Sequence, residues 1–298
     1  MKIKSTLLVG LFVTSTFAND FTSPSYRPGE NNLFASTRII IDSAEQTNER
    51  DNTNDDYKVS ADTTRVSQNL QFGLNKNLAL IADIDYVMSQ DIENDGTDTK
   101  ASGIERVSLG ASYRVSSYTK LPFILDAFGK FSPSIQNKDQ ATSNDDGSAN
   151  SGGHEITLGS RLTKGQFYFD FTFNYLMEQA VDSASTGDEI FTVEPYTIID
   201  FVIGYQIRPV DQLNINLEGL LTRVGEEEQS FQGGSNTLEA HYNFGFNILA
   251  QYKFLDNLTA DLGLQYLLGM DYNIDASQDQ TVNEFSQSRI SIGSTYLF

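Results

Sequence analysis

From Leu33 to the C-terminus the chain repeats one pattern of apolar and polar positions. Stretches of about ten residues alternate strictly, as in residues 166–178, where aromatic side chains take every second position and Asp170, Thr172 and Asn174 fall between them. Because successive side chains of a β-strand point to opposite faces of a sheet, each stretch predicts a strand with one apolar face. Such a face requires either a protein core or lipid.

The connectors between these stretches alternate between two kinds. Long polar connectors fall near residues 43–61, 89–102, 132–153, 179–192, 223–238 and 272–284, and short turns fall near residues 76–77, 117–120, 164–165, 209–210 and 256–257. This sorting predicts about twelve strands with both termini on one side, short periplasmic turns and long acidic external loops. The expected fold is therefore an all-β, transmembrane, antiparallel up-and-down β-barrel.

Two features favour lipid over a soluble core. The first is a set of aromatic residues at strand ends beside the turns, where interfacial girdles lie in membrane barrels: Phe72, Tyr113, Phe123, Phe167, Tyr205, Tyr252 and Phe254. The second is the last strand, residues 285–298, which alternates apolar or small residues and ends on Tyr296 and Phe298. This ending resembles the signal that the barrel-assembly machinery recognises in Gram-negative outer-membrane barrel proteins. The resemblance implies a location in the cell outer membrane and a porin-like architecture.

A second resemblance lies in two hairpins, residues 72–78 and 252–258, which share an aromatic residue, a short turn and an Asn-Leu pair. They are similar to repeats of the MetA-pathway family of outer-membrane transporters associated with phenol degradation. That resemblance implies apolar ligands as a variant of the channel function.

The N-terminus has the features of a secretory signal peptide. Lys2 and Lys4 precede the apolar residues 7–13, and small residues flank Phe17 where a signal peptidase would cleave. We expect a signal peptide at residues 1–18, a periplasmic N-terminal segment at residues 19–32 and the barrel at residues 33–298. Cleavage would take the net charge from -20 to about -22.

The amino-acid composition excludes several kinds of site and partner. The chain has no cysteine, so it forms no disulfide and no thiolate metal site, and its acidity excludes nucleic acid as a partner. We expect no cofactor, only diffuse attraction of divalent cations by the acidic loops among lipopolysaccharide and outer-membrane lipids. A weak calcium candidate combines Asp91, Glu93, Asp95 and Asp98, although Ser102 stands where a calcium loop carries its bidentate Glu.

Charged residues on the polar faces of the strands are the candidate lumen residues, because charges facing lipid are costly. They are Arg38, Arg65, Asp83, Asp85, Arg106, Arg114, Asp126, Lys130, Arg161, Asp170, Asp200, Glu218, Lys253, Asp261 and Arg289. Mixed signs allow two interpretations. The side chains either form a salt-bridged plug that stabilises the barrel, or line a polar path that selects small-molecule permeants.

No catalytic residue is assigned. His154 and His241 are the only imidazoles, and neither lies in a known catalytic motif. The sequence therefore predicts a passive channel for small polar or cationic solutes. The alternatives are a structural or surface-display barrel without an open pore, acting in adhesion or envelope integrity, and an outer-membrane hydrolase using His154 or His241.

Overall fold

A computed structural model of the whole chain provides the structure. It describes residues 27–50, 56–94, 97–115, 122–135, 138–140, 146–150, 152–183, 186, 189–231, 234–275 and 280–298. The regular elements of these residues are β-strands, and none of these ranges contains a helix long and apolar enough to cross a membrane. The expected signal peptide and turn 117–120 lie outside the described residues.

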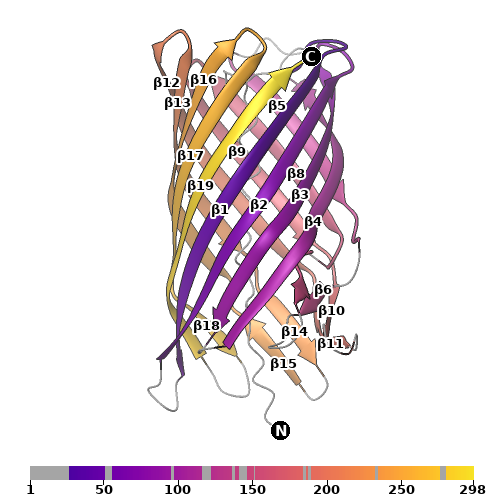
Figure 1. Cartoon of the computed structure of the whole chain (residues 1–298), viewed down its shortest axis with the longest axis vertical. Helices are drawn as coiled ribbons and strands as arrows, with labels where there is room; N and C mark the ends of the chain where they lie inside the picture. Colours follow the sequence, from indigo (N-terminus) through magenta and orange to yellow (C-terminus); the bar gives the residue numbers. More distant parts are fainter. Residues whose placement is uncertain are drawn as a thin grey trace.

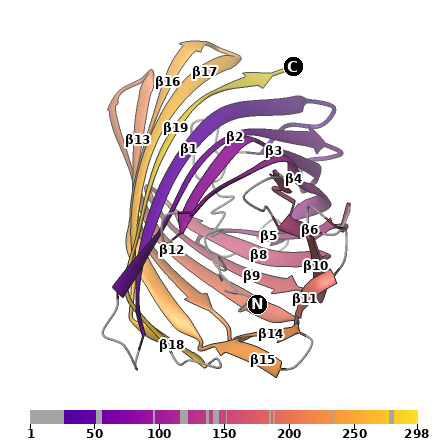
Figure 2. The ribbon, with the colours of Figure 1, turned by 60° about the horizontal axis from the view of Figure 1, so that its bottom comes forward.

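Twelve strands form a closed antiparallel barrel, which confirms the fold predicted from the alternation. Figures 1 and 2 show the tilted strands and the ring that they enclose. The twelve are β1 (Leu33–Arg50), β2 (Asp56–Gly73), β3 (Leu78–Asn94), β4 (Thr97–Arg114), β5 (Ile124–Ser132), β8 (Glu155–Lys164), β9 (Phe167–Leu176), β12 (Tyr196–Val210), β13 (Leu213–Val224), β16 (His241–Leu255), β17 (Leu258–Gly269) and β19 (Gln280–Leu297).

Seven short strands extend the wall at the end that carries the long connectors: β6 (Lys138–Gln140), β7 (Gly147–Ser148), β10 (Gln179–Ser183), β11 (Glu189–Val193), β14 (Glu227–Phe231), β15 (Gly234–Leu238) and β18 (Tyr272–Asp275). The long connectors predicted as loops are thus largely strand. β1 and β2, for example, stay paired as far as Glu49 and Asp56, well inside the connector expected at residues 43–61. The turn expected at residues 209–210 lies two residues later, at residues 211–212 between β12 and β13.

Two of the short strands pair in parallel and fill a gap in the wall. β5 and β8 have 9 and 10 residues, so they stop short of the extended ends of their neighbours. In the gap, β7 pairs with β4 at Ala101 and Ser102, and β6 pairs with β10 at Val181. Ala149 packs there against the inward-facing Val87 and Ala101. The connector between β5 and β8 therefore completes the wall near the external mouth.

The barrel closes where β19 pairs with β1. The two strands are hydrogen-bonded from Phe34, opposite Leu297, to Arg50, opposite Gln280. At the end of the seam the backbone N–H of Phe298 donates to the carbonyl of Leu33 at 2.8 Å. Closure leaves no free sheet edge along this seam, which is a requirement for a β-structure in lipid.

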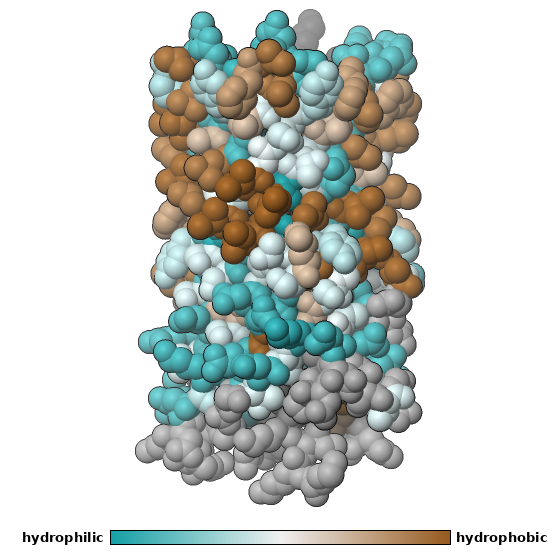
Figure 3. Space-filling model, in the orientation of Figure 1, coloured by the Kyte–Doolittle hydropathy of each residue, from teal (hydrophilic) through white to brown (hydrophobic). Residues whose placement is uncertain are grey.

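An apolar belt covers the outer surface of the barrel. Figure 3 shows hydrophobic residues over the upper half of the view and hydrophilic residues below them. On β16 the exposed apolar positions run from Tyr242 to Phe254. At about 3.3 Å per residue and a tilt of about 40°, that span rises about 30 Å, which matches the apolar band of a bilayer.

Aromatic side chains border this belt at the end with the short turns. Six of the seven aromatic residues predicted there are exposed, as are both aromatic residues of the terminal signal: Phe72, Tyr113, Phe167, Tyr205, Tyr252, Phe254, Tyr296 and Phe298. Phe123 is half-buried. The rings of Tyr296 and Phe298 contact each other edge to face, with centroids 4.4 Å apart. The predicted girdle is therefore present on the surface.

Changing Phe298 to Asp tests the terminal signal. We expect lower outer-membrane levels and protease-sensitive periplasmic protein, because the change removes the exposed terminal ring and adds a charge beside the closing seam. Heat-modifiable mobility on gels and cell fractionation measure the outcome. Leu255→Asp, at another exposed apolar position near a turn, is the control for a charge alone. Equal levels of both variants would contradict a specific role for the terminal residue.

Candidate functional site: the barrel lumen

The polar faces of the strands point inward, as the alternation predicts. Fourteen of the fifteen candidate lumen residues form hydrogen bonds or ion pairs on the inner wall; Lys253 is the exception. Lys253 lies near the end of β16, where its ammonium pairs with the exposed Asp256 of the following turn at 3.0 Å. This pair belongs to the periplasmic rim of the barrel.

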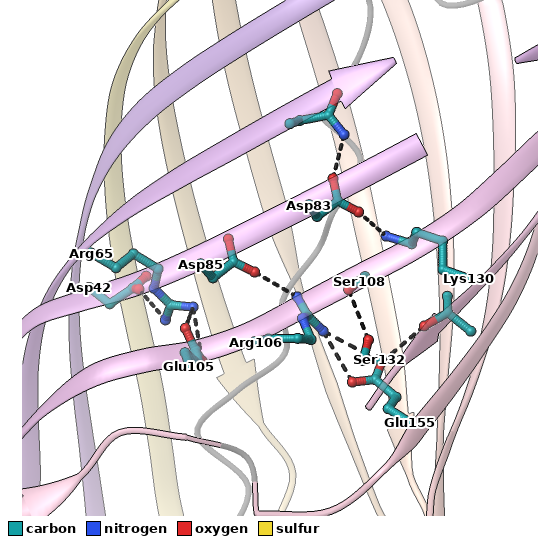
Figure 4. Close-up of polar contacts among 12 residues, drawn as sticks. Asp42, Arg65, Asp83, Asp85, Glu105, Arg106, Ser108, Lys130, Ser132 and Glu155 are labelled. Atoms are coloured by element: carbon teal, nitrogen blue, oxygen red, sulfur yellow. Dashed lines mark hydrogen bonds and ion pairs between the residues drawn. The ribbon is translucent and has the colours of Figure 1, made fainter. Parts of the chain in front are cut away.

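The most connected group of charges is centred on Arg65 of β2 (Figure 4). Its guanidinium donates to the carboxylate of Asp42 on β1 at 2.7 Å and pairs with Glu105 on β4 at 3.0 Å. Asp42 also accepts a hydrogen bond from Arg289 of β19. All four side chains are buried, so each charge is matched inside the wall.

A second group is centred on Arg106 of β4. Its guanidinium pairs with Asp85 of β3 at 3.1 Å and with Glu155 of β8 at 3.2 Å. A β-bulge allows Glu105 to face inward beside it: Asp85 lies opposite Arg106, and the next registered pair is Tyr86 with Ile104, which leaves Glu105 without an opposite residue. The bulge therefore places two consecutive charged side chains in the lumen, which strict alternation forbids.

The remaining ion pairs continue around the wall. Lys130 pairs with Asp83 at 3.1 Å, Arg161 with Asp170 at 2.6 Å, Arg38 with Asp261 at 2.7 Å and Arg114 with Asp126 at 2.9 Å. Arg27, from the segment before β1, also reaches Asp126, at 3.4 Å. Each of these lumen cations therefore has a carboxylate partner.

Two lumen carboxylates are held by neutral groups instead. Glu218 of β13 accepts hydrogen bonds from the Tyr168 hydroxyl at 2.5 Å and from the Asn247 amide at 2.6 Å. Asp200 of β12 accepts them from Thr222 at 2.6 Å and from Asn174 at 3.3 Å. The Tyr168 ring also lies flat over Gly204, where an added Cβ would come within 2.0 Å of the ring. Both acids are thereby held in place against the wall.

The reach of these contacts separates the two interpretations of the lumen. Arg65 bridges β2 to β4, Arg106 bridges β4 to β8 across β5, and Arg38 bridges β1 to β17 across β19. The named pairs between lumen strands thus join neighbours or next neighbours, whereas Arg27 reaches from the segment before β1 to Asp126 of β5. A plug would require pairs that cross the barrel. The ion-paired side chains of the strands therefore run along the wall.

Sequence reasoning missed Asp42, Glu105, Glu155 and Arg27. Asp42 has the same inward phase as Arg38, so the alternation itself could have found it. Glu105 is inward only because of the bulge, for which the sequence gives no signal. Glu155 could not be found from the sequence, because the cross-strand geometry that brings it to Arg106 is not visible along the chain.

The external end of the lumen carries one buried acid beyond the apolar belt. The long connector predicted near residues 223–238 contains β14, which turns Glu227 inward while its neighbours Glu226 and Glu228 stay exposed. Burial raises the pKa of Glu227 to about 7, and the hydrogen bond from Gln229 at 2.7 Å and the charge of Lys138 oppose this shift. Burial also lowers the pKa of Lys138.

The calcium candidate lies on the hairpin between β3 and β4. Asp91 and Glu93 are exposed on β3, Asp98 is exposed on β4, and Asp95 lies outside the described residues. Asp91 pairs with Lys100 at 3.5 Å, and Glu93 lies opposite Asp98 in the strand register. Across the described part of the chain, no group of three or more His, Cys, Asp or Glu residues is arranged to hold a metal ion.

Both histidines make contacts that hold the wall together. His154 Nδ1 accepts a hydrogen bond from the Ser134 backbone N–H at 2.9 Å, and its ring stacks on Phe131. His241 stacks on Tyr272 with ring centroids 4.0 Å apart, and its Nδ1 lies 3.1 Å from the Glu239 carbonyl. Neither arrangement pairs an imidazole with a hydroxyl nucleophile, so the geometry lends the hydrolase alternative no support.

The backbone is similar to solved outer-membrane barrels. An outer-membrane channel from Pseudomonas putida F1 covers 94% of this chain and 98% of its own, with a TM-score of 0.58 and 15% identity. A FadL homologue from Pseudomonas aeruginosa covers 89% and 90%, with a TM-score of 0.49 and 8% identity. The translocator domain of the autotransporter NalP from Neisseria meningitidis covers 88% of each chain, with a TM-score of 0.47 and 11% identity.

No protein-family model and no curated protein matches the sequence. The hairpin resemblance to the MetA-pathway family therefore stays a prediction. The similarity to the Pseudomonas putida channel concerns the fold and agrees with the closed wall and the apolar belt. The chain has the fold of an outer-membrane β-barrel.

Substituting Arg106 with Ala tests the wall network. The free energy of unfolding should fall by about 3–5 kcal/mol, because Asp85 and Glu155 would stay buried without their counter-charge. Lys100→Ala removes a pair whose side chains are 68% and 56% exposed, so it should cost about 0–1 kcal/mol. Denaturant unfolding of refolded protein in micelles, followed by circular dichroism, measures both. Equal losses would contradict a buried network.

Substituting Glu227 with Gln tests the buried acid at the mouth. Because burial raises its pKa to about 7, the carboxyl group is neutral at lower pH and stability is lost as the pH rises toward that value. The denaturant midpoint of the native protein should therefore fall as the pH rises from about 4.5 to about 7 and level off above that, and Glu227→Gln should flatten this dependence. Glu228→Gln, at an exposed neighbour, should retain it. A native profile that is already flat would contradict the assignment.

Proposed function

We propose that the barrel is a passive channel for small polar or cationic solutes. This proposal rests on the arrangement of the ion pairs between lumen strands. These pairs join neighbouring or next-neighbouring strands and lie along the wall. Polar side chains confined to the wall suit a path for hydrated solutes, whereas pairs across the axis would block it. The fold similarity to a solved channel agrees with this proposal.

The cationic preference would come from the external mouth. Each ion-paired lumen cation already has a carboxylate partner, so these pairs contribute little net field. Exposed acids such as Glu93, Glu226 and Glu228 lie beyond the apolar belt instead. A mouth rich in one sign of charge focuses its potential there and raises the local concentration of counter-ions.

One observation favours the second candidate, a structural barrel without an open pore. Many inward side chains have almost no exposed surface; Asp170 and Thr259, for example, are each 0% exposed. Such a lumen would be filled by its own side chains, and the barrel would serve to display acidic hairpins. Conductance distinguishes the two candidates, because only the channel passes ions.

Planar bilayers with purified, refolded protein provide the test. We expect discrete conductance steps and a reversal potential that shows cation preference. The preference should weaken with salt, because the screening length falls from about 10 Å at 0.1 M to about 3 Å at 1 M. Glu226→Gln with Glu228→Gln should reduce the preference and leave the pore open, whereas Asp256→Asn at the opposite rim is the matched control. Anion preference, or no conductance from folded protein, would contradict the proposal.

A further inference from the structure

The chain just before β1 turns sharply at the rim that carries the short turns. Asn32 extends the β1–β2 ladder by one step, since its carbonyl accepts a hydrogen bond from the Gly73 N–H at 3.0 Å. Asn31 then adopts a φ of 62°, a left-handed conformation in which asparagine is enriched. Its N–H donates to the Gly73 carbonyl at 2.8 Å, and the Asn32 N–H donates to the Gly29 carbonyl at 3.0 Å. These bonds turn the chain away from the line of β1.

Residues 28–29 lie on the inner face of β2. Gly73 shares the inward phase of Arg65 and Gln71 on the same strand, so a Cβ at this position would point into the lumen. An added Cβ would overlap the backbone carbonyl oxygens of both residues 28 and 29. The chain before β1 therefore occupies the space directly over this glycine, inside the barrel.

Arg27 continues from there across the wall to β5. Its guanidinium donates to the carbonyls of Asn77, in the turn after β2, and of Ser112 on β4. It also pairs with Asp126 on β5 at 3.4 Å. We call residues 27–32 the strap. Because neighbouring strands lie about 4.8 Å apart, the strap reaches across about 14 Å of the wall. It lies over four of the twelve strands, β2 to β5.

The wall does not need the strap to satisfy its own polar groups. Asp126 already pairs through both carboxylate oxygens with Arg114, at 2.9 and 3.0 Å. The Asn77 carbonyl already accepts the Arg114 N–H at 2.8 Å. Releasing Arg27 would therefore leave Asp126 with its counter-charge, and an uncompensated buried charge is the main cost of breaking such a pair. The strap is thus an addition to a complete wall.

We propose that the strap narrows the lumen at its periplasmic end, and that release of Arg27 widens it. This inference rests on the proposed channel function, because a solute that passes through the lumen must pass the strap. Pro28 is buried against the wall, whereas Gly29 and Glu30 are exposed. The strap is therefore packed on one side only, and its contacts with the wall decide whether it stays in the path.

Single-channel conductance of refolded protein in planar bilayers tests the strap. Arg27→Ala should raise the conductance by about 1.5-fold or more, the ratio of twelve strands to the eight that the strap leaves uncovered, because the width of a barrel grows about linearly with strand number. Gly73→Ala should give a similar increase, because its Cβ displaces the strap without changing its charge.

Two controls match these variants. Gly219→Ala on β13 adds a Cβ that meets nothing within 4 Å, and Lys253→Gln removes a cation at the same rim. Both should conduct as the native protein does. Heat-modifiable mobility shows that each variant is folded. Arg27 lies outside every strand, so Arg27→Ala still tests the strap if Gly73→Ala fails to fold.

Hydrogen exchange measures release of the strap independently of the current. The Asn31 N–H should exchange slowly in the native barrel and about tenfold faster in Arg27→Ala, the effect of losing a hydrogen bond to a charged group. Gly219→Ala should leave this rate unchanged. Exchange that stays slow in both Arg27→Ala and Gly73→Ala would overturn the inference, since these contacts would then not hold the strap.

The outcomes separate this inference from the proposed function. Faster exchange with an unchanged conductance would overturn the inference while the channel stands. A silent native barrel with strap variants that conduct would support the strap and contradict a passive native channel. Folded protein that is silent in every variant would overturn both. Larger conductance and faster exchange in the strap variants alone would support both.

Discussion

The structure depends on one constraint: a backbone surrounded by lipid must satisfy its own hydrogen bonds. The pairing of β19 with β1 meets this constraint by turning the sheet into a closed ring. Once the ring is closed, every strand has a lipid side and a lumen side, so the apolar belt and the polar wall follow from the same alternation. The polar lining of the lumen is therefore a direct consequence of closing the backbone hydrogen bonds into a ring.

Inside the ring the controlling factor is the cost of an unpaired buried charge. The wall meets this cost locally, by placing a carboxylate next to each of Arg65, Arg106 and Lys130 within two strands. Buried ion pairs of this kind add little net stability compared with apolar packing, but losing one partner is costly. The ion pairs of the lumen are thus electrically balanced, which leaves the external mouth as the region where a charged solute would be distinguished.

Alternation and connector length predicted the barrel and its strand number, and the same period of two assigned the polar face of each strand, because this patterning is present directly in the sequence. Three other features could not be predicted. The bulge that turns Glu105 inward depends on the pairing of β3 with β4. The strands within the long connectors depend on tertiary pairing of polar segments, and Glu227 is buried because its connector forms β14. The partner of each lumen charge depends on cross-strand register, which a single sequence does not contain.

The same charges have a consequence for how the ring finds its register. Alternation repeats every two residues, so a slip of β19 by two positions would leave every apolar residue facing lipid and every polar residue facing the lumen. Such a slip would nevertheless move Arg289 about 7 Å along the strand from Asp42, its partner across the seam. Arg38 and Asp261 reach across β19 in the same way. The two ion pairs therefore favour one register of β19 against β1, among several registers that the hydrophobic pattern alone does not distinguish.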